Sequence, residues 1–184
     1  MFENKNLTEL KISRTEFLRC MKTNDVSEAY LNWFRDSEVL KYTDLREIDC
    51  SEEALLAYVE AKSKSATELL LGIFKEKVLI GTVKLEVNWL HMRGSVAYLI
   101  GKRDCWGKGI ATRAVQRVIA YAFDELDLEK IVSGYYAYNL ASARVLEKLG
   151  FSVEGRGIGD LIYESERIDR VYVGLQKRFY KFNH

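Results

Sequence analysis

The sequence predicts an α/β (α+β) fold in which helices flank a central sheet. Short segments rich in apolar and β-branched residues have the character of strands, and they alternate with segments whose apolar residues recur at helical spacing. One apolar strand, at 96–100, passes through a turn with two glycines directly into an amphipathic helix. The chain has 184 residues, of which 48% are hydrophobic, so it can bury one sizeable core. We therefore expect residues 1–184 to form a single domain.

The first third of the chain predicts a strand and two helices. The strand is expected at 14–20. Asp25-Val-Ser-Glu28 has the pattern of a capping box and predicts the start of a helix, whose apolar side consists of Val26, Tyr30, Trp33 and Phe34. Ser51 is expected to cap the second helix, and residues 36–49 are expected to form a polar loop between the two.

The middle of the chain predicts a hairpin, then a strand, a helix and a further strand. Segments 69–74 and 78–87 are apolar and β-branched, and the charged turn between them is a hairpin signal. A strand at 95–101 precedes a helix at 110–126, and the next strand is expected at 130–138. The apolar face of this helix is broad and consists of Ile110, Ala111, Ala114, Val115, Val118, Ile119, Ala122, Phe123 and Leu126. The helix is therefore expected to lie on the core with one side in water.

The last part of the chain predicts a short helix followed by three strands. Asn139 is a good N-cap for this helix, and Gly150 stands where a left-handed C-cap is wanted. The buried positions of the helix are expected to be Val145, Leu146 and Leu149. The strands are expected at 151–154, 161–164 and 171–175, with the first connection loosened by Gly155, Gly157 and Gly159.

The turn between the strand at 95–101 and its helix has the properties of an anion site. Its glycines let the backbone approach a ligand closely and adopt dihedral angles that side chains disfavour. The first N–H groups of a helix have no partner within the helix and can hold a phosphate. The residues expected to form the site are Trp106, Gly107, Lys108, Gly109, Ile110, Ala111 and Thr112.

Spacing separates three kinds of phosphate site at this turn. A nucleotide P-loop is excluded, because Gly101 lies one residue too far from Gly107-Lys108 and Gly109 stands where the hydroxyl would be. A dinucleotide fingerprint is the weaker candidate, because the strand at 130–138 ends in Tyr-Asn rather than in Asp or Glu. The third interpretation is a site for the pyrophosphate of coenzyme A.

A second motif supports the coenzyme A interpretation. The segment from Asn139 to Phe151 begins a short helix with Asn and ends in Lys-Leu-Gly-Phe, and it follows the turn after one helix and one strand. In this order the two motifs resemble the GNAT acetyltransferase superfamily, and the resemblance covers most of the chain, from about Arg14 to about Phe179. Trp106 and the segment 30–39 resemble the branch that contains ribosomal-protein N-terminal, polyamine and amino-sugar nucleotide acetyltransferases.

The resemblance implies a GNAT fold and acetyl-CoA as the acyl donor. The sheet would be mixed and mostly antiparallel, with a splayed parallel pair formed by 95–101 and 130–138. Unpaired backbone groups at the splay are expected to bind the pantetheine arm as a substitute strand, and they belong to Leu99, Ile100 and Gly101. Asn139 and Ser142 are expected to contact the same cofactor.

The resemblance also implies the transfer of an acetyl group to a primary amine. The connection 36–49, which carries Tyr42 and Arg46, would border the acceptor pocket. An amine attacks a thioester only when it is neutral, and negative charge develops on the thioester oxygen. The site therefore needs a proton acceptor, an oxyanion donor such as a backbone N–H near Leu99 or Ile100, and a proton source for the thiolate.

The acid and the base depart from the pattern of the family. Many relatives place a proton-donating Tyr where this chain has Leu146, so we expect Tyr138 to replace it, with Tyr136 as the alternative. Alternation puts both tyrosines on one face if the strand stays regular. The candidate bases are Glu86 and His91, with Tyr98 third and bound water as the alternative.

Composition bounds the partners and the compartment. A net charge of +1 gives no support to a nucleic-acid partner or to a polycationic substrate. The cysteines, Cys20, Cys50 and Cys105, form neither a disulfide framework nor a zinc pattern, and with only two histidines no metal site is expected. No leader and no stretch long enough to cross a membrane are recognised, so a cytoplasmic location is expected.

We expect the acceptor to be a small-molecule amine or a peptide N-terminus, with an amino-sugar nucleotide slightly favoured. A protein N-terminus or a polyamine is the alternative within the same class of enzyme. Because the usual acid is absent at Leu146, a catalytically inactive coenzyme A-binding sensor is the alternative of another class. The sequence leaves open whether the chain forms a homodimer.

Overall fold

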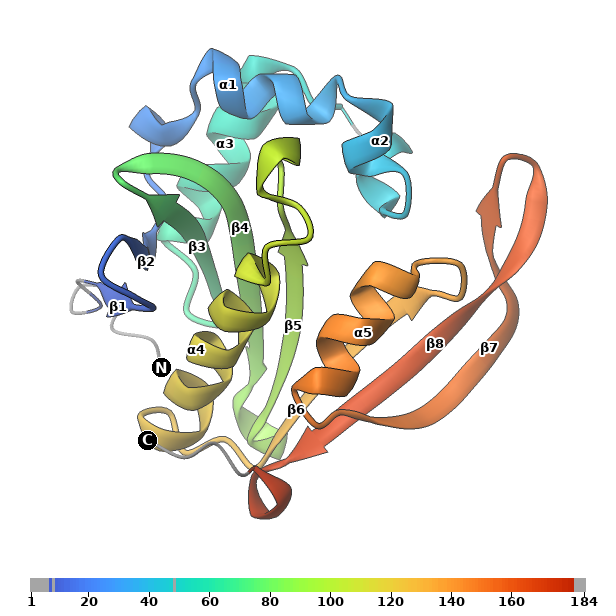
Figure 1. Ribbon diagram of the computed structural model, residues 1–184. Coiled ribbons are helices and arrows are strands. Elements are labelled where there is room, and N and C mark those ends of the chain that lie inside the picture. The colour runs from blue at the N-terminus through green and yellow to red at the C-terminus, as the bar shows by residue number, and fades with distance from the viewer. Residues whose placement is uncertain (1–6, 8, 48, 181–184) are drawn as a thin grey trace.

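A mixed eight-stranded sheet forms the centre of the protein, as a computed structural model shows for residues 7, 9–47 and 49–180 (Figure 1). The strand order is β1-β2-β3-β4-β5-β6-β8-β7, and β5 and β6 are parallel whereas the other neighbours are antiparallel. The strands are β1 (Leu10–Lys11), β2 (Glu16–Cys20), β3 (Glu68–Lys75), β4 (Val78–Asn88), β5 (Arg93–Leu99), β6 (Lys130–Tyr136), β7 (Ser152–Tyr163) and β8 (Glu166–Gln176). The predicted mixed sheet with one parallel pair is confirmed.

Helices cover both faces of this sheet. They are α1 (Glu28–Leu31), α2 (Ser37–Leu40), α3 (Glu52–Ser63), α4 (Ile110–Asp124) and α5 (Leu140–Lys148). In Figure 1, α4 and α5 lie in front of the sheet, α3 lies behind it, and α1 and α2 gather at its upper end. In the described part of the chain, no helix is long and apolar enough to cross a membrane.

The main core lies between α4 and the sheet. The side chains of α4 that are fully buried are Ala114, Val115, Val118, Ile119, Ala122 and Phe123. They belong to the apolar face that the sequence predicts for this helix, and its predicted start at Ile110 is also confirmed. A second cluster joins α1, α2 and α3 and includes Trp33. It reaches the end of β5, because a Cβ on Gly101 would lie 1.8 Å from Cδ2 of Trp33, so only glycine fits beneath the indole ring.

Several predicted boundaries are wrong. The N-cap of α1 is Ser27, which accepts from the N–H of Tyr30, whereas the Asp25 carboxylate is occupied by Arg19 and by the backbone of Lys22. Residues 36–49 do not form one loop, because α2 and a short 3-10 helix, η3 (Asp44–Glu47), interrupt them.

The C-terminal strands also differ from the prediction. β7 is one long strand across two predicted strands, because it pairs with β8 on both sides of its glycine-containing part. The glycines do not break it into a connection. Instead, the register with β8 shifts between Val153 and Gly155 and again between Gly157 and Leu161. The last segment is confirmed as β8, although it begins earlier than predicted.

The parallel pair separates soon after it begins. β5 and β6 are paired only from Arg93–Lys130 to Ser95–Val132. At the fork, the Ser133 hydroxyl donates to the backbone oxygen of Val96 at 2.9 Å and so occupies the first carbonyl beyond the ladder. Beyond this point the two strands diverge toward the upper end of the molecule in Figure 1. The predicted splay is therefore present.

Candidate functional site

The turn before α4 has its backbone donors free. Gly107 and Gly109 both have φ of +71°, a left-handed conformation that favours glycine. Gly109 is the N-cap of α4 and supplies no side chain to the helix end. Among the described residues, we find no acceptor for the N–H groups of residues 109–112. Such a row of free donors at the positive end of a helix dipole fits a pyrophosphate.

The open edge of β5 lies beside this turn. Residues two apart on a strand direct their backbone groups to the same edge, so Tyr98 and Ile100 face the splay as Val96 does. The Trp106 indole N–H donates to the backbone oxygen of Ile100 at 2.7 Å, which ties the turn to the strand. Leu99 differs from the prediction, because its carbonyl oxygen points toward Gly81 on β4, at 2.5 Å from a Cβ built there.

A pair of hydroxyl groups bridges the splay. The Tyr98 hydroxyl on β5 lies 2.7 Å from Oγ of Ser142 on α5, and either group can donate. The Tyr98 hydroxyl also donates to the backbone oxygen of Ser142 at 3.3 Å. Burial raises the pKa of Tyr98 to about 12, although the hydrogen bond with Ser142 opposes the rise. Tyr98 therefore holds its proton throughout the neutral range.

Asn139 acts as the predicted N-cap of α5. Its side-chain oxygen accepts from the N–H of Ser142 at 3.0 Å, which fixes the first turn of the helix. Among the described residues, the amide NH₂ of Asn139 has no partner, so it can donate to a ligand. Gly150, at φ +84°, confirms the predicted left-handed position after the helix.

The two tyrosines predicted as acids do not share one face. β6 ends at Tyr136, and Tyr138 lies in the turn that follows, with 57% of its surface exposed. Tyr136 is buried, and its hydroxyl donates to the Asp44 carboxylate at 2.5 Å. The condition that the strand stays regular is not met, so the alternation argument for Tyr138 is wrong.

The two side chains predicted as bases lie at the other end of β5. Glu86 is exposed, pairs in register with Ser95 at the closed end of the fork, and lies 3.8 Å from the Lys84 ammonium group. It lines a cleft of about 340 Å³ that contains none of the predicted cofactor residues. His91 is exposed in η4 (Trp89–His91), the turn between β4 and β5. Neither contacts the hydroxyl pair of Tyr98 and Ser142 in the described part of the chain.

A cluster of tyrosines lies on the other side of the splay, where η3 meets β6 and the β7–β8 hairpin. The Tyr42 ring lies 6.2 Å from the Tyr136 ring and 5.3 Å from the Tyr163 ring, measured between centroids. The Arg46 guanidinium carbon lies 5.7 Å from the Tyr136 centroid and 5.2 Å from the Tyr163 centroid. We call Tyr42, Tyr136 and Tyr163 the tyrosine cluster.

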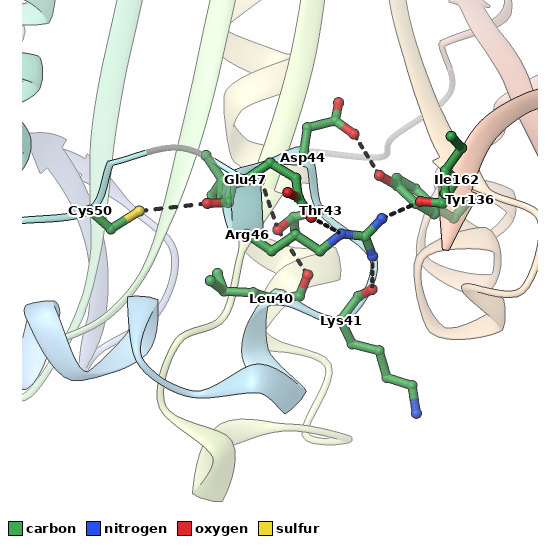
Figure 2. Close-up of polar contacts among 10 residues, drawn as sticks. Leu40, Lys41, Thr43, Asp44, Arg46, Glu47, Cys50, Tyr136 and Ile162 are labelled. Carbon is green, nitrogen blue, oxygen red and sulfur yellow. Dashed lines mark hydrogen bonds and ion pairs between the residues drawn. The ribbon is translucent and has the colours of Figure 1, made fainter. Parts of the chain in front are cut away.

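Two charged side chains attach η3 to this cluster (Figure 2). Arg46 donates to the backbone oxygens of Lys41 and Ile162, so it joins η3 to β7. Asp44 accepts from the Tyr136 hydroxyl and, at 3.1 Å, from Arg170 on β8. Residues 44–46 therefore join the end of β6 to the β7–β8 hairpin, and that this connection borders an acceptor pocket stays a prediction.

The charges in this region compensate each other. Burial alone would raise the pKa of Asp44, but hydrogen bonds from Tyr136 and Arg170 outweigh it and lower the pKa. Burial and the Asp44 hydrogen bond together raise the pKa of Tyr136 to about 12. Asp44 is thus a carboxylate and Tyr136 a neutral phenol at neutral pH, and the carboxylate charge is matched by Arg170.

Sequence reasoning missed two of these contacts. Tyr98 and Ser142 are 44 residues apart, and Asp44 and Tyr136 are 92 apart, so no local pattern joins them. The one available signal was the position of Ser142, three residues after the N-cap, where a side chain near the helix start can meet a strand. In the described residues no group of three or more His, Cys, Asp or Glu is arranged to hold a metal ion.

Comparisons with known proteins agree with this geometry. The family described as "Acetyltransferase (GNAT) domain" matches residues 17–152. YjcK of Bacillus subtilis (strain 168), named as a probable N-acetyltransferase, is 33% identical over 155 residues, which cover 77% of this chain and 83% of that protein. Spermidine N(1)-acetyltransferase of Escherichia coli (strain K12) is 38% identical over 76 residues, which cover 41% of this chain and 40% of that protein.

A solved structure of RimL, a ribosomal L7/L12 alpha-N-protein acetyltransferase in complex with coenzyme A, has the same fold. The two structures superpose with a TM-score of 0.82 at 16% sequence identity, and the match covers 91% of this chain and 97% of that chain.

Proposed function

Because the chain belongs to the GNAT acetyltransferase family and is an acetyl-CoA-dependent N-acetyltransferase, we propose that its acceptor amine meets the acetyl group beside the hydroxyl pair of Tyr98 and Ser142. The observation that carries the proposal is the splay of β5 and β6. It has free N–H groups at the turn before α4 on one side and the tyrosine cluster on the other. The hydroxyl pair joins β5 to α5 at this splay.

The residues at the splay fit acetyl-CoA. The free N–H groups of residues 109–112 would hold the pyrophosphate. The backbone groups of Tyr98 and the N–H of Ile100 would pair with the pantetheine amides, whereas the Ile100 oxygen already accepts from Trp106. The Asn139 amide would donate to the same arm. When bound, acetyl-CoA supplies a thioester whose acetyl group an amine can accept.

Ser142 is the proton source in this proposal. Its hydroxyl is held by Tyr98, whose pKa of about 12 keeps a proton next to it at neutral pH. When the leaving thiolate takes the proton at Oγ of Ser142, the Tyr98 hydroxyl returns a proton to Oγ. Tyr98 then regains a proton from the water that receives the proton of the amine. The amine loses its proton to water, because Glu86 and His91 lie at the far end of β5.

The acceptor region favours an amine on a neutral or anionic molecule. A polyamine such as spermidine needs carboxylates whose charge is not already matched. Here Asp44 is paired with Arg170, and the Arg46 guanidinium lies against Tyr136 and Tyr163. Two further carboxylates act on Tyr163, those of Glu38 and Glu164, and both side chains are exposed to solvent. Two acceptors remain, an amino-sugar nucleotide and a protein N-terminus. The second agrees with the similarity in fold to RimL, which is named an alpha-N-protein acetyltransferase.

An acceptor screen tests this proposal. Thiol release from acetyl-CoA is measured with amino-sugar nucleotides, with peptides that carry a free N-terminus, and with spermidine. We expect turnover in one of the first two groups and the lowest kcat/KM with spermidine. Spermidine as the best acceptor would contradict the charge argument. Coenzyme A binding without turnover on any amine would favour a catalytically inactive sensor.

A further inference from the structure

Glu16, near the start of β2, is unusual in its burial. Of the charged residues that the structure describes, it is the only one that is buried, with 5% of its surface exposed. A buried carboxylate needs a partner that compensates its charge and fills its hydrogen-bonding capacity. The partner is Arg113, which lies on α4, 97 residues away in the sequence.

The contact between them is a multiple charge-assisted hydrogen bond. Nε of Arg113 lies 3.0 Å from Oε2 of Glu16, and Nη2 lies 2.8 Å from both carboxylate oxygens. This geometry uses two of the three guanidinium nitrogens and fixes the plane of the group. The third nitrogen, Nη1, donates to the backbone oxygen of Lys108 at 3.0 Å.

Arg113 therefore holds two successive carbonyl groups of the turn. Its side chain binds the oxygen of Lys108, and its own backbone N–H donates to the oxygen of Gly109 at 3.1 Å. A trans peptide is planar, and its C=O and N–H point in opposite directions. Fixing these two carbonyl groups therefore turns the N–H groups of Gly109 and Ile110 away from Arg113, toward the side where the turn is open.

Electrostatics explains why Glu16 is needed for this arrangement. Arg113 is the fourth residue of α4, close to the positive end of the helix dipole, where a cation is unfavourable. The carboxylate of Glu16 compensates the guanidinium charge there. Arg113 can then stay beside the turn, where its Nη1 lies 3.2 Å from the position of a Cβ built on Gly109.

We propose that Glu16 and Arg113 are positioning residues for coenzyme A, which orient the backbone donors of the turn through the Lys108 carbonyl group. The inference rests on the proposed use of this turn as the pyrophosphate site. It adds that the donors are aimed by a contact between β2 and α4, and not by the glycines alone.

A paired substitution tests the proposal. Arg113→Met alone would leave Glu16 buried and unpaired, which destabilises a protein strongly, so the test uses Glu16→Met with Arg113→Met. Replacing a buried ion pair by apolar side chains of similar size is often neutral for stability. The control is Arg117→Met, the same substitution one turn later on α4.

The expected result separates affinity from stability. In the double variant we expect coenzyme A to bind about tenfold more weakly by calorimetry, KM for acetyl-CoA to rise by about the same factor, and kcat to stay within about threefold, because only cofactor binding is weakened. Glu16→Gln, which keeps the shape of the pair but removes its charge, should give a smaller change in the same direction. Arg117→Met should bind coenzyme A as the unsubstituted protein does.

Two other results are distinguishable from this one. If the unsubstituted protein binds coenzyme A and the double variant and Glu16→Gln bind it equally well, the positioning role is wrong while the proposed function stands. If the unsubstituted protein does not bind coenzyme A at all, the proposed function fails and the positioning role fails with it.

Discussion

Gly109→Ala tests whether the turn before α4 needs glycine for its ligand or only for its own shape. The φ of Gly109 is +71°, so an added Cβ brings the strain of a left-handed residue, about 1–2 kcal/mol. For a chain of this size that loss lowers Tm by about 2–8 °C. The new methyl group would also lie 3.2 Å from Nη1 of Arg113 and on the surface that a pyrophosphate approaches.

The effect on coenzyme A should be larger than the effect on stability. Loss of one charge-assisted hydrogen bond from the turn to a phosphate is worth about 1.5–3 kcal/mol, which corresponds to about 10- to 150-fold in Kd. Gly150→Ala is the matched control, because Gly150 has φ of +84° and its Cβ would meet only an ordinary contact, 3.7 Å from Leu175. It carries the same backbone strain at the end of α5, away from the turn.

Thermal unfolding and isothermal titration with coenzyme A measure the two effects separately. We expect both variants to lose similar stability and only Gly109→Ala to lose affinity. Unchanged affinity in Gly109→Ala would refute the pyrophosphate site. Equal loss of affinity in both variants would show that the effect is a general consequence of strain.

Three further predictions concern the hydroxyl pair and one ion pair. Ser142→Ala should lower kcat by about 100-fold with KM for acetyl-CoA nearly unchanged, since a general acid typically contributes about a factor of 100 to the rate. Ser142→Thr, which keeps a hydroxyl group, should restore most of the lost kcat. An unchanged kcat in Ser142→Ala would show that Ser142 is not the proton source. The raised pKa of Tyr98, about 12, keeps that hydroxyl protonated, so kcat/KM should rise with pH as the acceptor amine deprotonates. No decrease in kcat/KM is expected at any pH up to about 10. A decrease in kcat/KM near neutral pH would contradict this. Asp25→Asn should lower the free energy of unfolding by about 1–3 kcal/mol at pH 7, because the Asp25 carboxylate accepts two hydrogen bonds from Arg19 at 2.7 Å. Although burial opposes it, the Arg19 contact lowers the pKa of Asp25. This stabilisation is therefore present above the ordinary pKa of about 3.9 and is lost as the pH falls through the lower folded value. A difference between the two proteins that does not shrink as the pH is lowered below about 3.9 in denaturant titrations would contradict the assignment.

Local signals predicted most of the fold and the cofactor side of the site. The apolar face of α4, the Asn139 cap and the left-handed Gly150 each depend on residues a few positions apart, so their patterns are visible in the sequence. The free donors of the turn follow in the same way from two glycines placed before a helix.

Contacts between distant segments could not be predicted in this way. Tyr98 meets Ser142, and Glu16 meets Arg113, only because α4 and α5 pack on particular strands. The direction of the Leu99 carbonyl depends on which edge of β5 faces β4, a choice that apolar alternation does not encode. The sequence pattern divides β7 because its glycines have the local character of a connection, whereas pairing with β8 keeps them in the sheet.

The most direct test of the account is whether coenzyme A binds at the turn before α4. A ligand that binds only the folded state raises Tm, so melting curves with coenzyme A and with NAD are compared for the unsubstituted protein and for Gly109→Glu, which places a negative side chain at the free donors. We predict that coenzyme A, and not NAD, stabilises the unsubstituted protein and that Gly109→Glu abolishes this stabilisation. Stabilisation by NAD alone, or undiminished stabilisation of Gly109→Glu by coenzyme A, would contradict the account.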